Sequence, residues 1–178
     1  MQWSKPDLDR CVHGSISPAE LRALGLDAID VIDFSANVNP LGVSPRAQNA
    51  MTEVDVARYP DPDCLELRQA LSRATGMAVE GILVGNGSTE LIHLLAQACL
   101  AGGGPDAVGA AILAPTFGEY DMACCLAGVR PAVIRAREED SFRWDVAKVC
   151  QEIRRLRPRL VFLCNPNNPT GLYLDKKA

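Results

Sequence analysis

Apolar residues form short unbroken runs and longer periodic stretches, and the two kinds alternate along most of the chain. The unbroken runs at 81–84, 108–113, 131–135 and 160–163 predict strands that are buried on both faces. A shorter run at 31–34 also has the pattern of a strand. Strands of this kind need cover on both sides of their sheet, which the segments between them must supply.

Periodic apolar positions predict the helices between these runs. The expected helices are 18–24, 45–54, 64–75, 89–100, 118–126 and 145–156. Ser17 and Asp63 are placed to cap the first turns of two helices. Gly25 and Gly76 are placed to end the same two. Alternation of buried strands with helices is typical of the α/β class, so we expect a mainly parallel sheet in a three-layer αβα arrangement.

Composition narrows the class of protein. The 178 residues are 48% apolar and 22% charged, which is typical of a folded globular chain and not of a disordered or fibrous one. The formal net charge of −4 argues against general binding of nucleic acid, which requires an excess of basic residues. Apolar runs are too short for a membrane span, and the polar start MQWSKPDLDR lacks a signal core, so we expect a cytoplasmic protein.

The cysteines and histidines suggest structural roles. The sequence has 7 cysteines but no CxxC pair, so we expect neither a metal site nor a redox site. Several cysteines fall within predicted helices and are interpreted as small buried side chains: Cys99, Cys124, Cys125 and Cys150. His93 lies inside an apolar helix and is interpreted as a core histidine.

Three unusual loops directly follow predicted strands. They are GNGSTE at 85–90, APTFGEY at 114–120 and NPNNPTG at 165–171. Ligands of open α/β sheets bind outside the carboxyl ends of the strands. The coincidence of these loops therefore predicts a ligand site at one edge of the sheet.

The first of these loops has the residues of a phosphate cradle. Its glycines allow a tight turn, the following helix offers N–H groups, and Ser88 and Thr89 add hydroxyl donors. An ordinary glycine turn with a serine cap has the same pattern. The loop is not a Walker A sequence, and Glu90 stands where a dinucleotide fingerprint needs its third glycine.

The other two loops present an aromatic ring and a set of amides. Phe117 is placed to stack on a flat ligand ring, although core packing is the simpler explanation of this residue taken alone. In the third loop, Pro166 and Pro169 constrain the backbone while three asparagine amides are displayed at a strand end. Such amides can donate to a phenolate or a carboxylate.

Together these loops resemble the pyridoxal-phosphate enzymes of fold type I, in the class I and II aminotransferase group. The segment RYPDPD at 58–63 is similar to the histidinol-phosphate aminotransferase branch. His13-Gly14 and FSANVNPLG at 34–42 are similar to the L-threonine-O-3-phosphate decarboxylases, cobalamin-pathway enzymes of that branch. The resemblance implies that 1–43 belong to a small domain and 44–178 form the first part of the cofactor-binding large domain.

The resemblance also implies a role in cofactor binding for each matching residue. Gly87, Ser88 and Thr89 would hold the phosphate of pyridoxal 5′-phosphate. Phe117 would stack on the pyridine ring of the cofactor. Asn168 would donate to the 3′-oxygen of the cofactor and lie beside the substrate.

The resemblance also implies that three further residues contact the substrate or the cofactor of a partner subunit. Tyr59 would reach the cofactor phosphate of a neighbouring subunit, which implies a homodimer. His13 and Asn37 lie where the acid groups of the substrate are expected. A small phosphorylated amino acid or amine is the substrate implied, with neither nucleic acid nor membrane as a partner.

Relatives form a Schiff base through a lysine that follows the NPNNPTG loop at a distance. Lys5, Lys148, Lys176 and Lys177 do not match that lysine. We therefore expect the chain to be the N-terminal part of a longer enzyme. The run at 81–84 would then lack its neighbouring strands, so we expect the isolated chain to be poorly stable and catalytically inactive.

Several functions stay open at this point. A threonine-phosphate decarboxylase is favoured, and a transaminase of the histidinol-phosphate type is the alternative. Outside the family, a domain that binds a nucleotide or S-adenosylmethionine could use GNGSTE, but NPNNPTG would have no role there. A non-catalytic chain is the remaining hypothesis.

Overall fold

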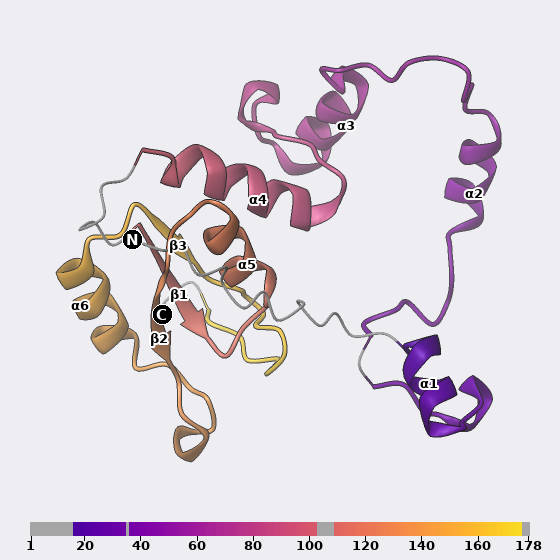
Figure 1. Ribbon diagram of the computed structural model, residues 1–178. Coiled ribbons are helices and arrows are strands. Elements are labelled where there is room, and N and C mark those ends of the chain that lie inside the picture. The colour runs from indigo at the N-terminus through magenta and orange to yellow at the C-terminus, as the bar shows by residue number, and fades with distance from the viewer. Residues whose placement is uncertain (1–15, 35, 103–108, 176–178) are drawn as a thin grey trace. The chain divides into compact units, whose positions relative to one another are not determined.

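The computed structural model describes residues 16–34, 36–102 and 109–175 (Figure 1). The described residues form two compact units, with the boundary between Val84 and Gly85. The predicted domain division after residue 43 stays a prediction. We describe each unit by itself.

The first unit is helical. Its elements are α1 (Pro18–Leu24), η1 (Ala28–Asp30), α2 (Pro45–Thr52), α3 (Leu65–Thr75) and η2 (Val79–Gly81), of which η1 and η2 are short 3₁₀ helices. The predicted cap of α1 is confirmed, because the Ser17 hydroxyl accepts the Glu20 N–H at 3.3 Å. Gly25 and Gly76 end α1 and α3 with φ values of +66° and +75°, a conformation that favours glycine.

The cap of α3 differs from the predicted one. Asp61, not Asp63, accepts the N–H of Leu65 at 2.8 Å, and it also accepts the N–H of Asp63 at 3.0 Å. These two backbone hydrogen bonds lower the pKa of Asp61. The backbone turns at Cys64, whose φ is +47°, and the turn brings the earlier aspartate to the start of the helix.

Two predicted strands are absent from the described residues. Residues 31–34 pair with no other segment. Ile82 has extended angles, φ −112° and ψ 120°, but 82–84 likewise form no strand, and 62% of Leu83 is exposed. A strand exists only where a neighbour pairs its N–H and C=O groups, and an apolar run by itself supplies no neighbour.

The second unit is built on a parallel sheet with the strand order β2–β1–β3. Its strands are β1 (Ala110–Ala114), β2 (Ala132–Arg135) and β3 (Leu160–Phe162). Ala111 of the central strand lies beside Ala132 on one side and Val161 on the other. The predicted α/β class and the parallel sheet are confirmed.

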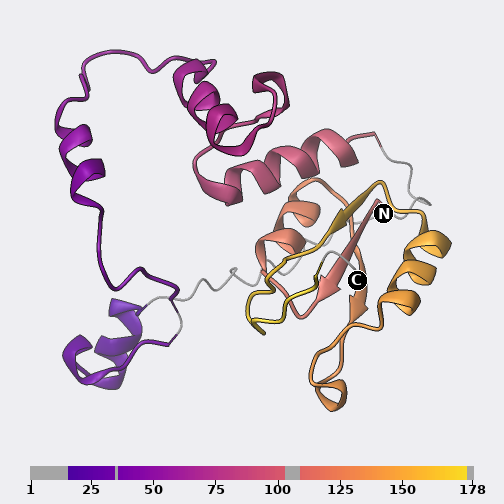
Figure 2. The ribbon, with the colours of Figure 1, turned by 180° about the vertical axis from the view of Figure 1, so that it is seen from behind.

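Helices cover both faces of this sheet. They are α4 (Gly87–Leu100), α5 (Glu119–Leu126) and α6 (Val146–Leu156), with the 3₁₀ turn η3 (Glu138–Asp140) before α6. Figures 1 and 2 show α4 and α5 on one side and α6 on the other. The connection from β1 to β2 and the connection from β2 to β3 run in opposite directions across the sheet. Because both are right-handed crossovers, their helices α5 and α6 lie on opposite faces, which gives the predicted three layers.

The core of this unit lies between the sheet and the α4–α5 pair. It comprises Ile92, Ala96, Leu100, Ala110, Ile112, Ala123, Cys124 and Phe162. The prediction of buried cysteines is confirmed for Cys124 and wrong for Cys150, which is exposed. Cys150 follows the buried Val149 on α6, and a step of one residue turns a helical side chain toward solvent. Cys99 and Cys125 are half-buried.

Among the described residues, none of the helices combines the length and apolar character needed to cross a membrane. The same part of the chain contains no cluster of side chains suited to hold a metal ion.

Candidate functional site

The loops after β1 and β3 meet at the carboxyl edge of the sheet. The side-chain amide of Asn167 donates to the carbonyl oxygen of Pro115 at 2.9 Å and to the Thr170 hydroxyl at 2.8 Å. Only 7% of Asn167 is exposed. One buried amide therefore holds the loop that carries Asn168 against the loop that carries Phe117.

The loop after β3 is also closed on itself. Asn167 donates its N–H to Leu172 and accepts the N–H of Gly171, at 2.8 and 2.7 Å. The side chain of Asn165 exchanges two hydrogen bonds with the backbone of Leu174, at 2.8 and 2.9 Å. The expected display of three amides is therefore wrong for Asn167, which is buried, whereas Asn168 is exposed; Asn165 is also exposed, but its amide is engaged by Leu174.

Phe117 is held by an aromatic stack. Its ring meets the edge of Tyr120 with centroids 5.9 Å apart at 88°, and Tyr120 stacks on Phe162 at 4.7 Å and 14°. Burial, together with a hydrogen bond to Cys164, raises the pKa of Tyr120 to about 12. Phe117 is half-buried and packs against the core, so its role in stacking on a cofactor ring stays a prediction.

The first turn of α4 suits an anion. The Asn86 side chain at the N-cap makes no capping bond, although the N–H and the side-chain amide of Asn86 both donate to the Glu90 carboxylate, and the Gly87 N–H donates to the Gly85 carbonyl oxygen. Gly87 has a φ of +76°, and a Cβ at this position would meet nothing within 4 Å. Ser88 is exposed and Thr89 half-buried, so hydroxyls stand beside the open space. The role of this turn as a phosphate cradle stays a prediction.

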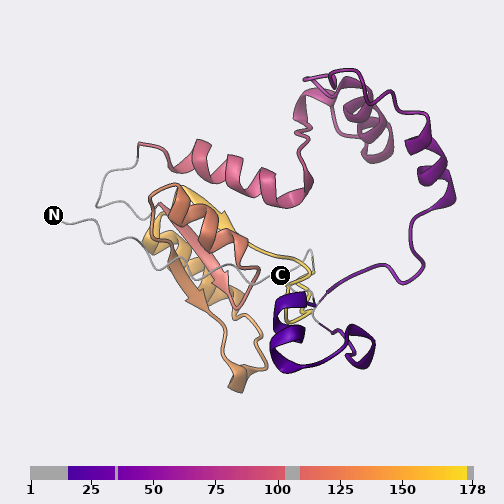
Figure 3. The ribbon, with the colours of Figure 1, turned by 45° about the vertical axis from the view of Figure 1, so that its right-hand side comes forward.

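The start of α4 lies at the same edge of the sheet as the two loops. Figure 3 shows α4 running antiparallel to β1, with its N-terminus toward the end at which the strands finish. The imidazole of His93 on α4 lies 2.8 Å from the carboxylate of Glu119, which follows Phe117 by two residues. The second unit therefore brings Gly87, Ser88, Thr89, Phe117 and Asn168 to one edge.

The remaining predicted site residues lie elsewhere in the chain. Tyr59 and Asn37 belong to the first unit and are exposed, Tyr59 completely. His13 lies outside the described residues. The roles assigned to these three residues stay predictions.

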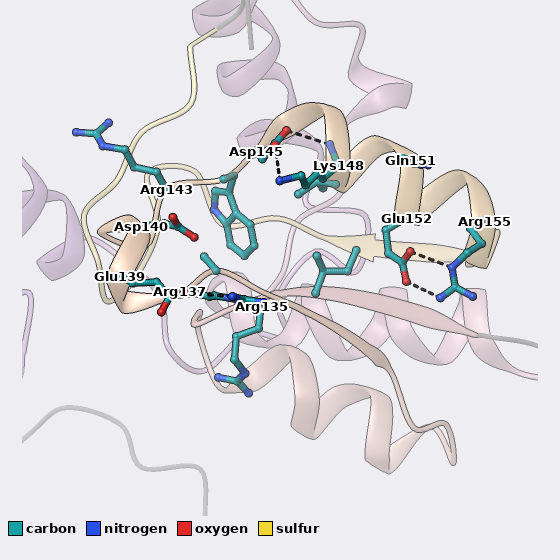
Figure 4. A pocket seen from close by; sticks show the side chains of 14 residues that line it. Arg135, Arg137, Glu139, Asp140, Arg143, Asp145, Lys148, Gln151, Glu152 and Arg155 are labelled. Carbon is teal, nitrogen blue, oxygen red and sulfur yellow. Dashed lines mark hydrogen bonds and ion pairs between the residues drawn. The ribbon is translucent and has the colours of Figure 1, made fainter.

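A separate cavity of about 1010 Å³ lies between β2, η3 and α6 (Figure 4). Much of the charge on its wall is paired: Arg137 with Glu139 at 2.8 Å and Lys148 with Asp145 at 3.1 Å. None of the predicted site residues lines this cavity.

Residues 29–178 match the sequence profile of the family described as aminotransferase class I and II. This chain belongs to that family. Enzymes of the family depend on pyridoxal phosphate, which confirms the cofactor that the resemblance of the three loops implied. The assignment excludes the nucleotide-binding alternative.

Similar proteins carry the names of two activities. A histidinol-phosphate aminotransferase of Moorella thermoacetica is 38% identical over 88% of this chain and 39% of its own length. A provisionally named threonine-phosphate decarboxylase of Caldanaerobacter subterraneus is 41% identical, over 76% of this chain and 35% of its own. The chain thus spans about two fifths of the length of these relatives.

A solved structure agrees with the fold. A decarboxylase from Sulfurospirillum multivorans has a TM-score of 0.59 and 30% identity, covering 75% of this chain and 32% of that protein.

Two residues that sequence reasoning did not assign to the site belong to its framework. Asn167 was treated as one of three equivalent displayed amides, and Tyr120 was not singled out. The sequence does carry a signal for Tyr120, because it stands three residues after Phe117, the spacing at which helical side chains meet. No local signal separates Asn167 from Asn168, since burial of one of them depends on the loop after β1.

Proposed function

We propose that this chain forms the first part of the cofactor-binding domain of a pyridoxal-phosphate enzyme that acts on a small phosphorylated amino acid or amine. One observation carries the proposal. The Asn167–Pro115 hydrogen bond joins the loops of Phe117 and Asn168 at the edge where α4 begins. A phosphate contact, a ring-stacking contact and an amide donor can therefore act on one ligand.

The residues present fit the cofactor. The open first turn at Gly87, Ser88 and Thr89 would bind its phosphate, Phe117 would cover one face of its ring, and Asn168 would donate an N–H to its phenolic oxygen. When bound, pyridoxal phosphate supplies an electron sink for a carbanion at the α-carbon of the substrate. The chain's own contribution here is to hold the ring at three points and in one orientation.

We assign decarboxylation of threonine phosphate as the favoured activity. The support is the segment FSANVNPLG at 34–42 with His13-Gly14, together with the relative from Caldanaerobacter that carries this name. In this proposal His13 and Asn37 bind the acid groups of the substrate. The exposed Tyr59 reaches the cofactor phosphate of a second subunit in a homodimer.

A histidinol-phosphate aminotransferase is the second candidate. Its support is the Moorella relative, which aligns with 88% of this chain. Residues that hold the cofactor phosphate, ring face and phenolic oxygen serve both reactions. The three loops therefore do not separate decarboxylation from transamination, and the substrate must be tested directly.

Product analysis on the natural full-length protein, loaded with pyridoxal phosphate, distinguishes the candidates. Release of CO₂ from threonine phosphate without any 2-oxo acid would support the decarboxylase. Turnover of histidinol phosphate only in the presence of 2-oxoglutarate would support the aminotransferase. Neither reaction, with no binding of the cofactor, would favour a non-catalytic chain and contradict the proposal.

A further inference from the structure

We propose that Asn167 is a positioning residue, which sets the distance between the ring-covering Phe117 and the hydrogen-bonding Asn168. The inference rests on the proposed function, because it concerns how this chain holds pyridoxal phosphate. Asn167 does not itself contact the cofactor in this proposal, since its side chain is buried between the loops.

The contacts of Asn167 reach both loops at once. Its Nδ2 group carries two N–H donors, and both have acceptors: the Pro115 carbonyl at 2.9 Å and the Thr170 hydroxyl at 2.8 Å. Its backbone N–H donates to the Leu172 carbonyl oxygen, and its backbone C=O accepts the N–H of Gly171. Four hydrogen bonds therefore hold this residue, two through its side-chain Nδ2 group and two through its backbone.

These partners place Asn167 between two cofactor contacts. Pro115 precedes Phe117 by two residues, and Asn168 is the next residue in the chain. Among the described residues, the other hydrogen bonds of the loop after β3 include turn bonds within the loop and the contact of Cys164 with Tyr120, so the Asn167–Pro115 bond is a direct link to the loop after β1. Stacking and hydrogen bonding to one rigid ring require both loops to hold their positions within a fraction of an ångström.

Only a side chain with two donors and the size of asparagine meets this demand. An aspartate at 167 has almost the same shape, but its carboxylate would face the Pro115 carbonyl with an acceptor instead of a donor. The Asn167→Asp variant therefore removes the link, but it also buries a negative charge, so Asn167→Leu, which removes both donors and adds no charge, is measured beside it and should show the same loss. Asn49→Asp is the matched control, because Asn49 is exposed on α2 and receives the same change of charge.

The test measures binding of pyridoxamine 5′-phosphate to the natural full-length protein by calorimetry. This ligand has no aldehyde, so its binding requires no Schiff base. We expect N167D to raise its Kd about tenfold, the effect of one lost buried hydrogen bond. N49D should leave that Kd unchanged. The Kd for inorganic phosphate, measured by competition, should be unchanged in N167D, because the α4 cradle alone binds it.

A second arm separates positioning from general damage to the fold. In a Phe117→Ala background the ring contact is already lost, so N167D should raise the Kd less than twofold, which is a non-additive pair. An unchanged Kd in N167D, or the same tenfold loss in both backgrounds, would overturn the inference alone. A wild-type protein that binds no pyridoxamine phosphate would overturn the proposed function and the inference with it.

Discussion

The Nε2 atom of His93 lies 2.8 Å from the Oε2 atom of Glu119, and this contact joins α4 to α5. The Glu119 side chain is 6% exposed and that of His93 is 23% exposed. The interpretation of His93 as a packed histidine is therefore compatible with the structure, which adds that its ring partners a buried carboxylate. The apolar pattern of α4 did not reveal this, since the partner comes from another helix.

Replacing His93 should destabilise the second unit. In the His93→Leu variant, Glu119 would stay buried without its imidazole partner, so we expect the free energy of unfolding to fall by about 1–3 kcal/mol. Urea denaturation at pH 7 measures the change. Glu139→Gln is the control, because the Arg137–Glu139 pair is 73% and 68% exposed and should contribute less than about 0.5 kcal/mol. Equal losses in the two variants would contradict this prediction.

Stability should decrease at alkaline pH. Burial raises the pKa of Cys124 from 9.0 to about 12 and that of Tyr120 from 10.0 to about 12. Unfolded chains release these protons at lower pH than folded ones, so the contribution of both groups is complete below pH 9 and is lost as pH rises toward 12. Denaturation midpoints measured from pH 8 to 11 check this expectation.

Cys124→Ala should reduce the steepness of that alkaline loss, whereas Cys150→Ala should leave it unchanged, because Cys150 is exposed. The same contrast should govern alkylation by iodoacetamide at pH 8.5, where Cys150 reacts and Cys124 stays protected until the protein unfolds. Rapid labelling of Cys124 in the folded protein would show that this prediction is wrong.

Gly87→Ala should impair both the fold and the cradle. A φ of +76° is unfavourable for any residue with a Cβ, at a cost of about 1–2 kcal/mol. The new methyl group would also stand in the open space where we place the phosphate. We expect lower stability and weaker binding of inorganic phosphate. Gly81→Ala is the control, because a Cβ there would meet only Met77, at an ordinary 3.9 Å; a similar effect of both changes would argue against the cradle.

Asn165→Ala should release the end of the described chain. The variant loses both hydrogen bonds with Leu174, one of which protects the Leu174 amide. Hydrogen exchange of that amide should accelerate about tenfold or more, since its protection depends on a local side-chain acceptor. The amides of β1 should keep their exchange rates, and an unchanged rate at Leu174 would contradict the assigned contact.

Sequence patterns were most reliable where a feature depends on neighbours along the chain. Ser17 begins its helix and Gly25 and Gly76 end theirs as expected, because capping involves groups only a few residues apart. The strands of the sheet were found from their apolar runs, although β1 begins and ends later than expected. The run at 82–84 failed as a strand, because pairing needs a second segment that no local pattern specifies.

The same distinction holds at the candidate site. The amino-acid sequence by itself determined the three loops, since glycine, proline and asparagine constrain the backbone locally, and the resemblance of these loops to known enzymes implied the family and its cofactor. Only the tertiary structure decided which amide of NPNNPTG is buried, that Tyr120 supports Phe117, and that Glu119 partners His93. Each of these contacts joins two elements far apart in sequence, and packing of the sheet and its helices sets the distance between them.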